Sequence, residues 1–219
     1  IKINKLDDLQ AILNRGRVKV VIAAGSLAMA LKKAAADLDG ISFKMGEAGD
    51  PNKTDSKIYI PPERIEQAKS MLETGRKNGV EFVLPVDFII EDGTAVDQIP
   101  DGAAQFDIGP KSSELQAKKV GEFIEFSKKK QAAGEGPAVC FHNGVFGMFE
   151  KEQFANGTRK FMDQLKRMND SGVQVYVGGG EGGAGESPRR RREQHRYPKS
   201  TAFPAWRNSV RPARGGGDL

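Results

Sequence analysis

Residues 18–26, Val-Lys-Val-Val-Ile-Ala-Ala-Gly-Ser, indicate the fold class most clearly. The β-branched run is apolar at successive positions, which is typical of a strand in a parallel sheet that helices cover on both faces. The strand ends at Gly25, and Ser26 is a candidate N-cap for a following helix. That helix is predicted to run through Leu31, and Gly40 closes the segment. The stretch therefore predicts a strand followed at once by a helix.

The same alternation continues on both sides of this stretch. Apolar residues at helical spacing predict a first helix around Leu6–Leu13. Further strands are predicted at 80–84, 88–90, 105–108, 137–141 and 173–177, and further helices at 62–79, from Pro110 past Phe126, and from Phe154 to Gly172. Polar residues predict exposed loops at 45–56 and from Ile90 to Gly102. Strands that alternate with long helices require right-handed crossovers. We expect an α/β fold: a three-layer, Rossmann-like parallel sheet with helices on both faces.

Composition restricts the class of protein. With 38% hydrophobic and 29% charged residues, the chain of 219 residues is typical of a globular protein large enough for an enzyme domain. No apolar run is long enough to cross a bilayer, and the first residues do not form a secretory signal. Cys140 is the single cysteine, which excludes an internal disulfide and fits a reducing cytosol.

The basic charge is concentrated in one segment. The whole chain carries +5, whereas residues 188–219 hold eight Arg and one Lys against Glu193 and Asp218, a net of +7, which leaves −2 for residues 1–187. The segment 188–219 has no helical or alternating period. We therefore expect a basic, disordered tail after a domain of residues 1–187. Nucleic-acid binding through Arg189–Arg192 would depend on this tail alone, and nucleic acid is not an expected partner.

The carboxyl ends of the predicted strands hold polar and glycine residues: Gly25, Asp87, Asp107, Asn143 and the glycine segment 178–183. Ligands of open α/β sheets bind at this edge. The glycine segment, Gly-Gly-Gly-Glu-Gly-Gly, leaves backbone amides free to cradle phosphate. It also fits G-x-G-x-x-G, but Phe203 stands where a dinucleotide fingerprint needs an acid. A flexible break before the tail explains it equally well. A Walker loop is excluded, because Pro110 stands where its pattern requires Lys.

Two reactive residue types lie on one predicted strand. Cys140 is interpreted as a core residue rather than a catalytic thiol, because no base lies near it in the sequence. His142 ends the strand, where a structural and a functional role are both open. Because His195 lies in the tail, the sequence does not predict a His/Cys metal site.

Five groups of residues occur in an order typical of one enzyme family. They are Ile58-Tyr-Ile-Pro-Pro-Glu-Arg-Ile-Glu-Gln-Ala68, Val83-Leu-Pro-Val-Asp87, Ile99-Pro-Asp-Gly102 with Asp107-Ile-Gly-Pro110, His142-Asn-Gly-Val-Phe-Gly-Met-Phe-Glu150 with Phe154-Ala-Asn-Gly-Thr158, and Gly178-Gly-Gly-Glu181. In these groups the chain resembles the carboxyl-terminal, nucleotide-binding domain of phosphoglycerate kinases. The resemblance implies a glycolytic kinase that uses MgATP or MgADP and exchanges a phosphoryl group with the carboxylate of 3-phosphoglycerate. It also implies a cytoplasmic monomer without a membrane partner. By the same resemblance, the acceptor-binding, amino-terminal domain of the family is absent from this chain.

The resemblance implies nucleotide-binding roles for eleven residues. They are Lys2 and Lys5 as phosphate-contacting lysines, Ala24, Gly25, Phe106, Asn143, Gly144, Met148, Glu150, Gly179 and Gly180. Ala24 and Gly25 would line an adenine slot with Phe106 as its other wall. Glu150 would hold the ribose hydroxyls.

The same resemblance implies a phosphate and metal corner. Asn143 and Gly144 would lie by the phosphates, and the amides of Gly179 and Gly180 would stabilise phosphate charge at a helix start. Glu181 would bind Mg²⁺, for which a carboxylate is a suitable ligand.

Several positions depart from the family pattern. Ala23-Ala-Gly-Ser26 replaces G-G-G-M, and His142, Val145 and Gly182 replace Trp, Pro and Thr. An alternative hypothesis is therefore a catalytically degenerate nucleotide-binding module that keeps the fold, its activity lost with the missing amino-terminal domain.

Overall fold

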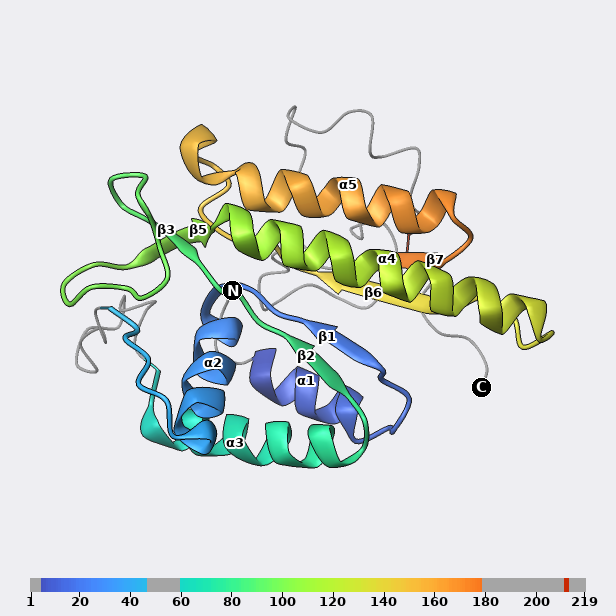
Figure 1. Ribbon diagram of the computed structural model, residues 1–219, viewed down its shortest axis with the longest axis horizontal. Coiled ribbons are helices and arrows are strands. Elements are labelled where there is room, and N and C mark those ends of the chain that lie inside the picture. The colour runs from blue at the N-terminus through green and yellow to red at the C-terminus, as the bar shows by residue number, and fades with distance from the viewer. Residues whose placement is uncertain (1–4, 47–59, 179–210, 213–219) are drawn as a thin grey trace, which may run out of the picture. The chain divides into compact units, whose positions relative to one another are not determined.

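The computed structural model describes residues 5–46, 60–178 and 211–212 (Figure 1). The chain divides into two compact units. Unit 1 comprises the described residues up to Gln116 together with Val145–Arg159, and unit 2 comprises Ala117–Gly144 and the described residues from Lys160 onward. Each unit therefore consists of two separate stretches of the sequence, and two helices contribute residues to both units.

One part of unit 1 is a parallel strand pair with three helices. This part consists of α1 (Lys5–Leu13), β1 (Val20–Ile22), α2 (Gly25–Asp39), α3 (Pro62–Lys77) and β2 (Glu81–Val83). Strands β1 and β2 pair in parallel, with Val20 opposite Glu81, as the apolar runs predicted. Helix α3 contacts α1, α2 and β2. The core between them is built from small and aliphatic side chains, including Leu31, Ala68 and Leu72, all fully buried.

Helix α2 departs from its predicted boundaries. It begins at Gly25 after Ala24 and makes no side-chain cap hydrogen bond, so the prediction of Ser26 as N-cap is wrong. The helix also extends well past Leu31, to Asp39, because its apolar face continues against α3. Its end is confirmed, since Gly40 adopts a left-handed φ of 67° and its N–H reaches the carbonyls of Ala36 and Asp37.

A second, antiparallel sheet lies in unit 1. It has the order β4-β3-β5, with β3 at Phe88–Ile90, β4 at Ala95–Val96 and β5 at Gln105–Ile108. Strand β4 pairs with β3 inside the stretch predicted as a polar loop up to Gly102, so that prediction is wrong. The antiparallel pairing of β3 with β5 also shows that the described strands do not all run in parallel. Tertiary pairing stabilises β4, whose two residues are too few for a strand pattern.

Unit 2 is a parallel sheet with helices beside it. Its elements are the larger part of α4 (Pro110–Ala132), β6 (Val139–Asn143), the larger part of α5 (Asn156–Asp170), β7 (Gln174–Gly178) and β8 (Arg211–Pro212). Figure 1 shows α4 and α5 side by side, and the Arg167 guanidinium donates to the Ala117 carbonyl across them. Strand β8 lies in the segment predicted to be disordered, whose other residues lie outside those described.

The α/β class is confirmed, and the two pairs β1–β2 and β6–β7 are parallel as expected. Within the part of the chain that the structure describes, no helix is long and apolar enough to span a membrane. The polar loop predicted at 45–56 lies almost wholly outside the described residues.

Candidate functional site

The carboxyl ends of β6 and β7 lie side by side in unit 2. Their register places Asn143 opposite Gly178, the first residue of the glycine segment. The Asn143 side chain is exposed, and Gly144 follows it with a φ of 99°, which a side chain would strain. The structure therefore brings Asn143 next to the start of the glycine segment, as the topology predicted. The residues that follow, Gly179, Gly180 and Glu181, lie outside the described residues, and their roles stay predictions.

Residues 145–155 form a segment in unit 1 that is held against β5. The Met148 amide donates to the Phe106 carbonyl at 2.9 Å, so two of the predicted nucleotide-binding residues are adjacent. The Phe106 ring stacks on Phe154, with 4.9 Å between ring centroids. Phe154 ends the short 3-10 helix η1 (Glu152–Phe154) and is buried. Met148 and Glu150 remain exposed on this segment, where they are accessible to a ligand.

Three other predicted site residues lie in unit 1. Ala24 is buried, with 4% of its surface exposed, and Gly25 begins α2 with a φ of 66°. Lys5 begins α1 and forms an ion pair with Asp8 at 3.5 Å. Nothing in these contacts tests a nucleotide-binding role, so each role stays a prediction. Lys2 lies outside the described residues.

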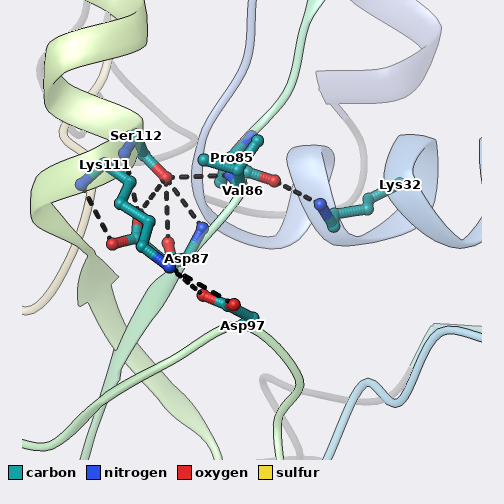
Figure 2. A network of polar contacts seen from close by, with 7 residues as sticks. All are labelled: Lys32, Pro85, Val86, Asp87, Asp97, Lys111 and Ser112. Atoms are coloured by element: carbon teal, nitrogen blue, oxygen red, sulfur yellow. Dashed lines mark hydrogen bonds and ion pairs between the residues drawn. The ribbon is translucent and has the colours of Figure 1, made fainter.

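The two aspartates predicted at strand ends, Asp87 and Asp107, are buried, and each carboxylate accepts a backbone amide from the start of a helix. Figure 2 shows Asp87, which is 2% exposed, at the start of α4. Its carboxylate accepts hydrogen bonds from the Ser112 amide at 2.7 Å, the Ser112 hydroxyl at 2.6 Å and the Lys111 amide at 3.0 Å. The first turn of α4 contains no acidic residue of its own. Asp87 therefore caps this helix across 25 positions of sequence and stabilises its positive end.

Lys32 of α2 lies near the same network. Its ammonium donates to the Pro85 carbonyl at 2.5 Å and lies 5.2 Å from the Phe43 ring centroid and 5.8 Å from that of Phe88. Burial lowers the pKa of Lys32, although the carboxylates of Asp97 and Asp87 oppose that shift. Lys32 thus ties α2 to the end of β2 within unit 1.

Asp107 has a comparable role at the start of α5. It is 1% exposed, and its two carboxylate oxygens accept the amides of Ile108 and Gly157, both at 2.8 Å. Burial raises the pKa of Asp107 to about 6, although the hydrogen bonds from Gly157 and Ile108 oppose that shift. A carboxylate is thus kept in a site that disfavours its charge.

His142 and Cys140 lie on β6 in unit 2. Burial lowers the pKa of His142 to about 4, and its ring packs 5.5 Å from that of Phe161 on α5. The imidazole is therefore neutral at physiological pH, which favours the structural interpretation. Cys140 is half-buried, and burial raises the pKa of its thiol to about 11. Because the thiolate is the nucleophile, this shift agrees with a non-catalytic Cys140.

The residues that the structure describes contain no group of three or more His, Cys, Asp or Glu that could hold a metal ion. The one predicted metal ligand, Glu181, is not among them.

Sequence reasoning missed several contacts around Phe106. It did not predict the stacking of Phe154, nor the Lys151 ammonium 5.9 Å from the Phe106 ring centroid. The bond from Asp107 to the start of α5 was also missed, since Gly157 lies 50 positions away. One signal was available: the first turn of α5 has no acidic residue, so its amides need an acceptor from elsewhere.

Comparison with known proteins gives one consistent result. A family model described as phosphoglycerate kinase matches residues 2–185. A phosphoglycerate kinase of Fervidobacterium nodosum is 34% identical over 145 residues, which are 62% of this chain and 33% of that protein. A protein named cytosolic phosphoglycerate kinase, from Triticum aestivum, is 31% identical over 134 residues, which are 57% of this chain and 30% of that protein.

A solved structure extends the likeness to the fold. The structure of phosphoglycerate kinase from Coxiella burnetii matches with a TM-score of 0.55 and 24% sequence identity, and the match covers 82% of this chain and 40% of that one. At this identity the match concerns the fold alone. This chain spans about a third of the length of the relatives it matches.

Proposed function

Because this chain belongs to the phosphoglycerate kinase family, we propose that it is the nucleotide-binding part of a phosphotransferase. In this proposal it binds MgATP or MgADP for phosphoryl transfer between ATP and the carboxylate of 3-phosphoglycerate in glycolysis. Members of the family use ATP and Mg²⁺. Acceptor binding is assigned to residues outside this chain, which matches only about a third of its relatives' length.

The register of β6 and β7 is the observation that carries the proposal. Asn143 lies opposite Gly178 at the carboxyl ends of two adjacent parallel strands. Ligands of α/β sheets bind at such ends, and the glycine residues that follow have no β-carbons to block a phosphate. Phosphoryl transfer depends mainly on positioning and on neutralising charge. In the proposal, the amides of Gly179 and Gly180 and the Asn143 side chain supply the phosphate contacts.

We assign contacts with the base and the ribose to the segment that contains Met148 and Glu150. Both side chains are exposed, and the Met148 amide hydrogen bond fixes the backbone at this point to β5. Phe106, Ala24 and Gly25 complete the proposed adenine slot, and Lys2 and Lys5 are assigned to phosphate. A carboxylate such as Glu150 is a strong acceptor for the ribose hydroxyls.

Magnesium is assigned to Glu181, a hard oxygen ligand suited to this ion. When bound, the ion would offset phosphate charge. The remaining parts of the proposal are a three-layer, Rossmann-like fold with helices on both faces of a parallel sheet, a domain of residues 1–187, and a cytoplasmic monomer. The name of the Triticum aestivum relative, which contains the word cytosolic, supports that location.

Calorimetric titration of the 219-residue chain with MgADP tests the proposal. We expect saturable heat at millimolar nucleotide or below. Glu150→Gln should weaken binding by about tenfold or more, because a hydrogen bond to a charged group contributes about 1.5–3 kcal/mol. Glu114→Gln is the matched control: Glu114 is exposed on α4 and has no assigned role, so affinity should not change. The absence of a binding heat at millimolar MgADP would show that the proposal is wrong.

A degenerate binding module is the second candidate. Ala24 is buried at the proposed adenine slot, where the family pattern has glycine, and its methyl group occupies space there. The distinction requires a turnover assay in which the acceptor-binding part of a phosphoglycerate kinase is supplied as a separate chain. Phosphorylation of 3-phosphoglycerate in that mixture excludes the degenerate module, whereas MgADP binding without turnover supports it.

A further inference from the structure

Two consecutive residues of β5 hold both ends of segment 147–157. At one end the Phe106 carbonyl accepts the Met148 amide at 2.9 Å. At the other end the Asp107 carboxylate accepts the Gly157 amide at 2.8 Å. Between these ends, Phe154 stacks on the Phe106 ring. The segment is thus fixed to one strand at three points, although Met148 and Glu150 stay exposed.

The packing around Asp107 leaves little freedom for this arrangement. A β-carbon on Gly147 would lie 2.9 Å from the Asp107 Cα, and one on Gly157 would lie 2.3 Å from Asp107 Oδ1. Both glycines therefore contact the aspartate with no space for a side chain. The next residue, Thr158, is buried, and its hydroxyl accepts the Phe146 amide at 3.1 Å. The first turn of α5 and the start of the segment are consequently held together.

We propose that Asp107 is a positioning residue for nucleotide binding: its carboxylate, through Gly157 and the adjoining backbone, fixes the segment that presents Met148 and Glu150. This inference rests on the proposed function. Asp107 itself is 1% exposed, so we assign it no direct contact with the nucleotide. Its effect is on the geometry of the residues that do.

The state of the carboxyl group supports this role. Burial raises the pKa of Asp107 to about 6, so keeping it ionised at neutral pH costs folding free energy. Strongly shifted groups cluster at functional sites, where orientation matters more than stability. A neutral side chain of the same shape cannot replace it fully. The amide of asparagine accepts only through Oδ1, and its NH₂ group would face an amide that now donates to Oδ2.

The test compares Asp107→Asn with Ser112→Ala in the 219-residue chain. Ser112 is also buried at the first turn of a helix, and its hydroxyl accepts the amides of Val86 and Asp87, but it has no link to segment 147–157. Both variants should lower the melting temperature. Asp107→Asn should weaken MgADP binding by at least about tenfold, which is typical of residues that orient a binding residue. Ser112→Ala should leave MgADP affinity within about twofold, because its side-chain hydrogen bonds go to Val86 and Asp87 and not to segment 147–157.

Amide hydrogen exchange provides a readout that needs no nucleotide. In Asp107→Asn the amides of Met148 and Gly157 should exchange faster, whereas in Ser112→Ala they should match the unmodified chain. Unchanged exchange at these amides overturns the inference. Faster exchange with unchanged MgADP affinity also overturns it, since Asp107 would then be structural only. If the unmodified chain gives no heat with MgADP, the proposed function fails, and the inference fails with it.

Discussion

Replacing Asp87 by alanine is expected to lower the free energy of unfolding by about 3–5 kcal/mol. This is the loss that is typical when one partner is removed from a buried, hydrogen-bonded charge network. The substitution leaves the amides of Lys111 and Ser112 without their acceptor. The Ser112 hydroxyl loses the carboxylate and keeps only the backbone carbonyl of residue 87 as its acceptor. It also removes a negative charge from the positive end of a helix of 23 residues. Urea unfolding followed by far-ultraviolet circular dichroism measures the change.

Asp97→Ala is the matched control for this network (Figure 2). Asp97 also bonds to the start of α4, through an ion pair with Lys111 at 3.0 Å, but both of these side chains are exposed to solvent. Exposed ion pairs contribute about 0–1 kcal/mol to stability, so the free energy of unfolding of this variant should be close to that of the unmodified chain. Equal losses for the two variants would show that Asp87 does not act as the buried cap of α4.

Gly147→Ala should destabilise unit 1 by about 3 kcal/mol, the upper range for a side chain forced into a packed site. The added β-carbon would lie 2.2 Å from the Phe106 carbonyl oxygen, which is backbone and cannot rotate away. Relief requires segment 147–157 to move off β5, and that movement would stretch the Met148 amide hydrogen bond. Thermal unfolding and exchange at the Met148 amide both report this change.

Gly121→Ala is the control for the glycine substitution. Its β-carbon would meet only the tip of the flexible Arg167 side chain, at 3.1 Å. Because Gly121 lies inside α4, alanine there should stabilise the helix by about 0.5–1 kcal/mol. If Gly147→Ala proves as stable as the unmodified chain, segment 147–157 is not packed against β5 as described.

Strand and helix order could be predicted from the sequence because each element carries its own local pattern. The β-branched run at β1 and the apolar spacing of α3 are examples, and both elements form. Strand β4 could not be predicted, since Ala95–Val96 has no period and forms by pairing with β3. The start of α2 was misplaced because Ser26 resembles a cap, whereas the N-cap is Ala24, two residues earlier, and the helix begins at Gly25.

The candidate site was predictable where strand ends alone determine it. The ends of β6 and β7 bring Asn143 beside Gly178 because adjacent parallel strands end at one edge. The inward roles of Asp87 and Asp107 were not predictable, because each carboxylate bonds to a helix start 24 or more positions away. From sequence, an aspartate after a strand indicates a ligand and a helix cap equally well.

Hydrogen exchange with and without saturating MgADP tests whether nucleotide binds through the residues at the carboxyl ends of β6 and β7 and through residues 145–150. We expect slower exchange in peptides that cover residues 143–150 and 178–183. Exchange over α3, Pro62–Lys77, should not change, because this helix has no assigned contact with the nucleotide. Protection confined to other parts of the chain, with residues 143–150 unaffected at saturation, would show that the nucleotide binds elsewhere.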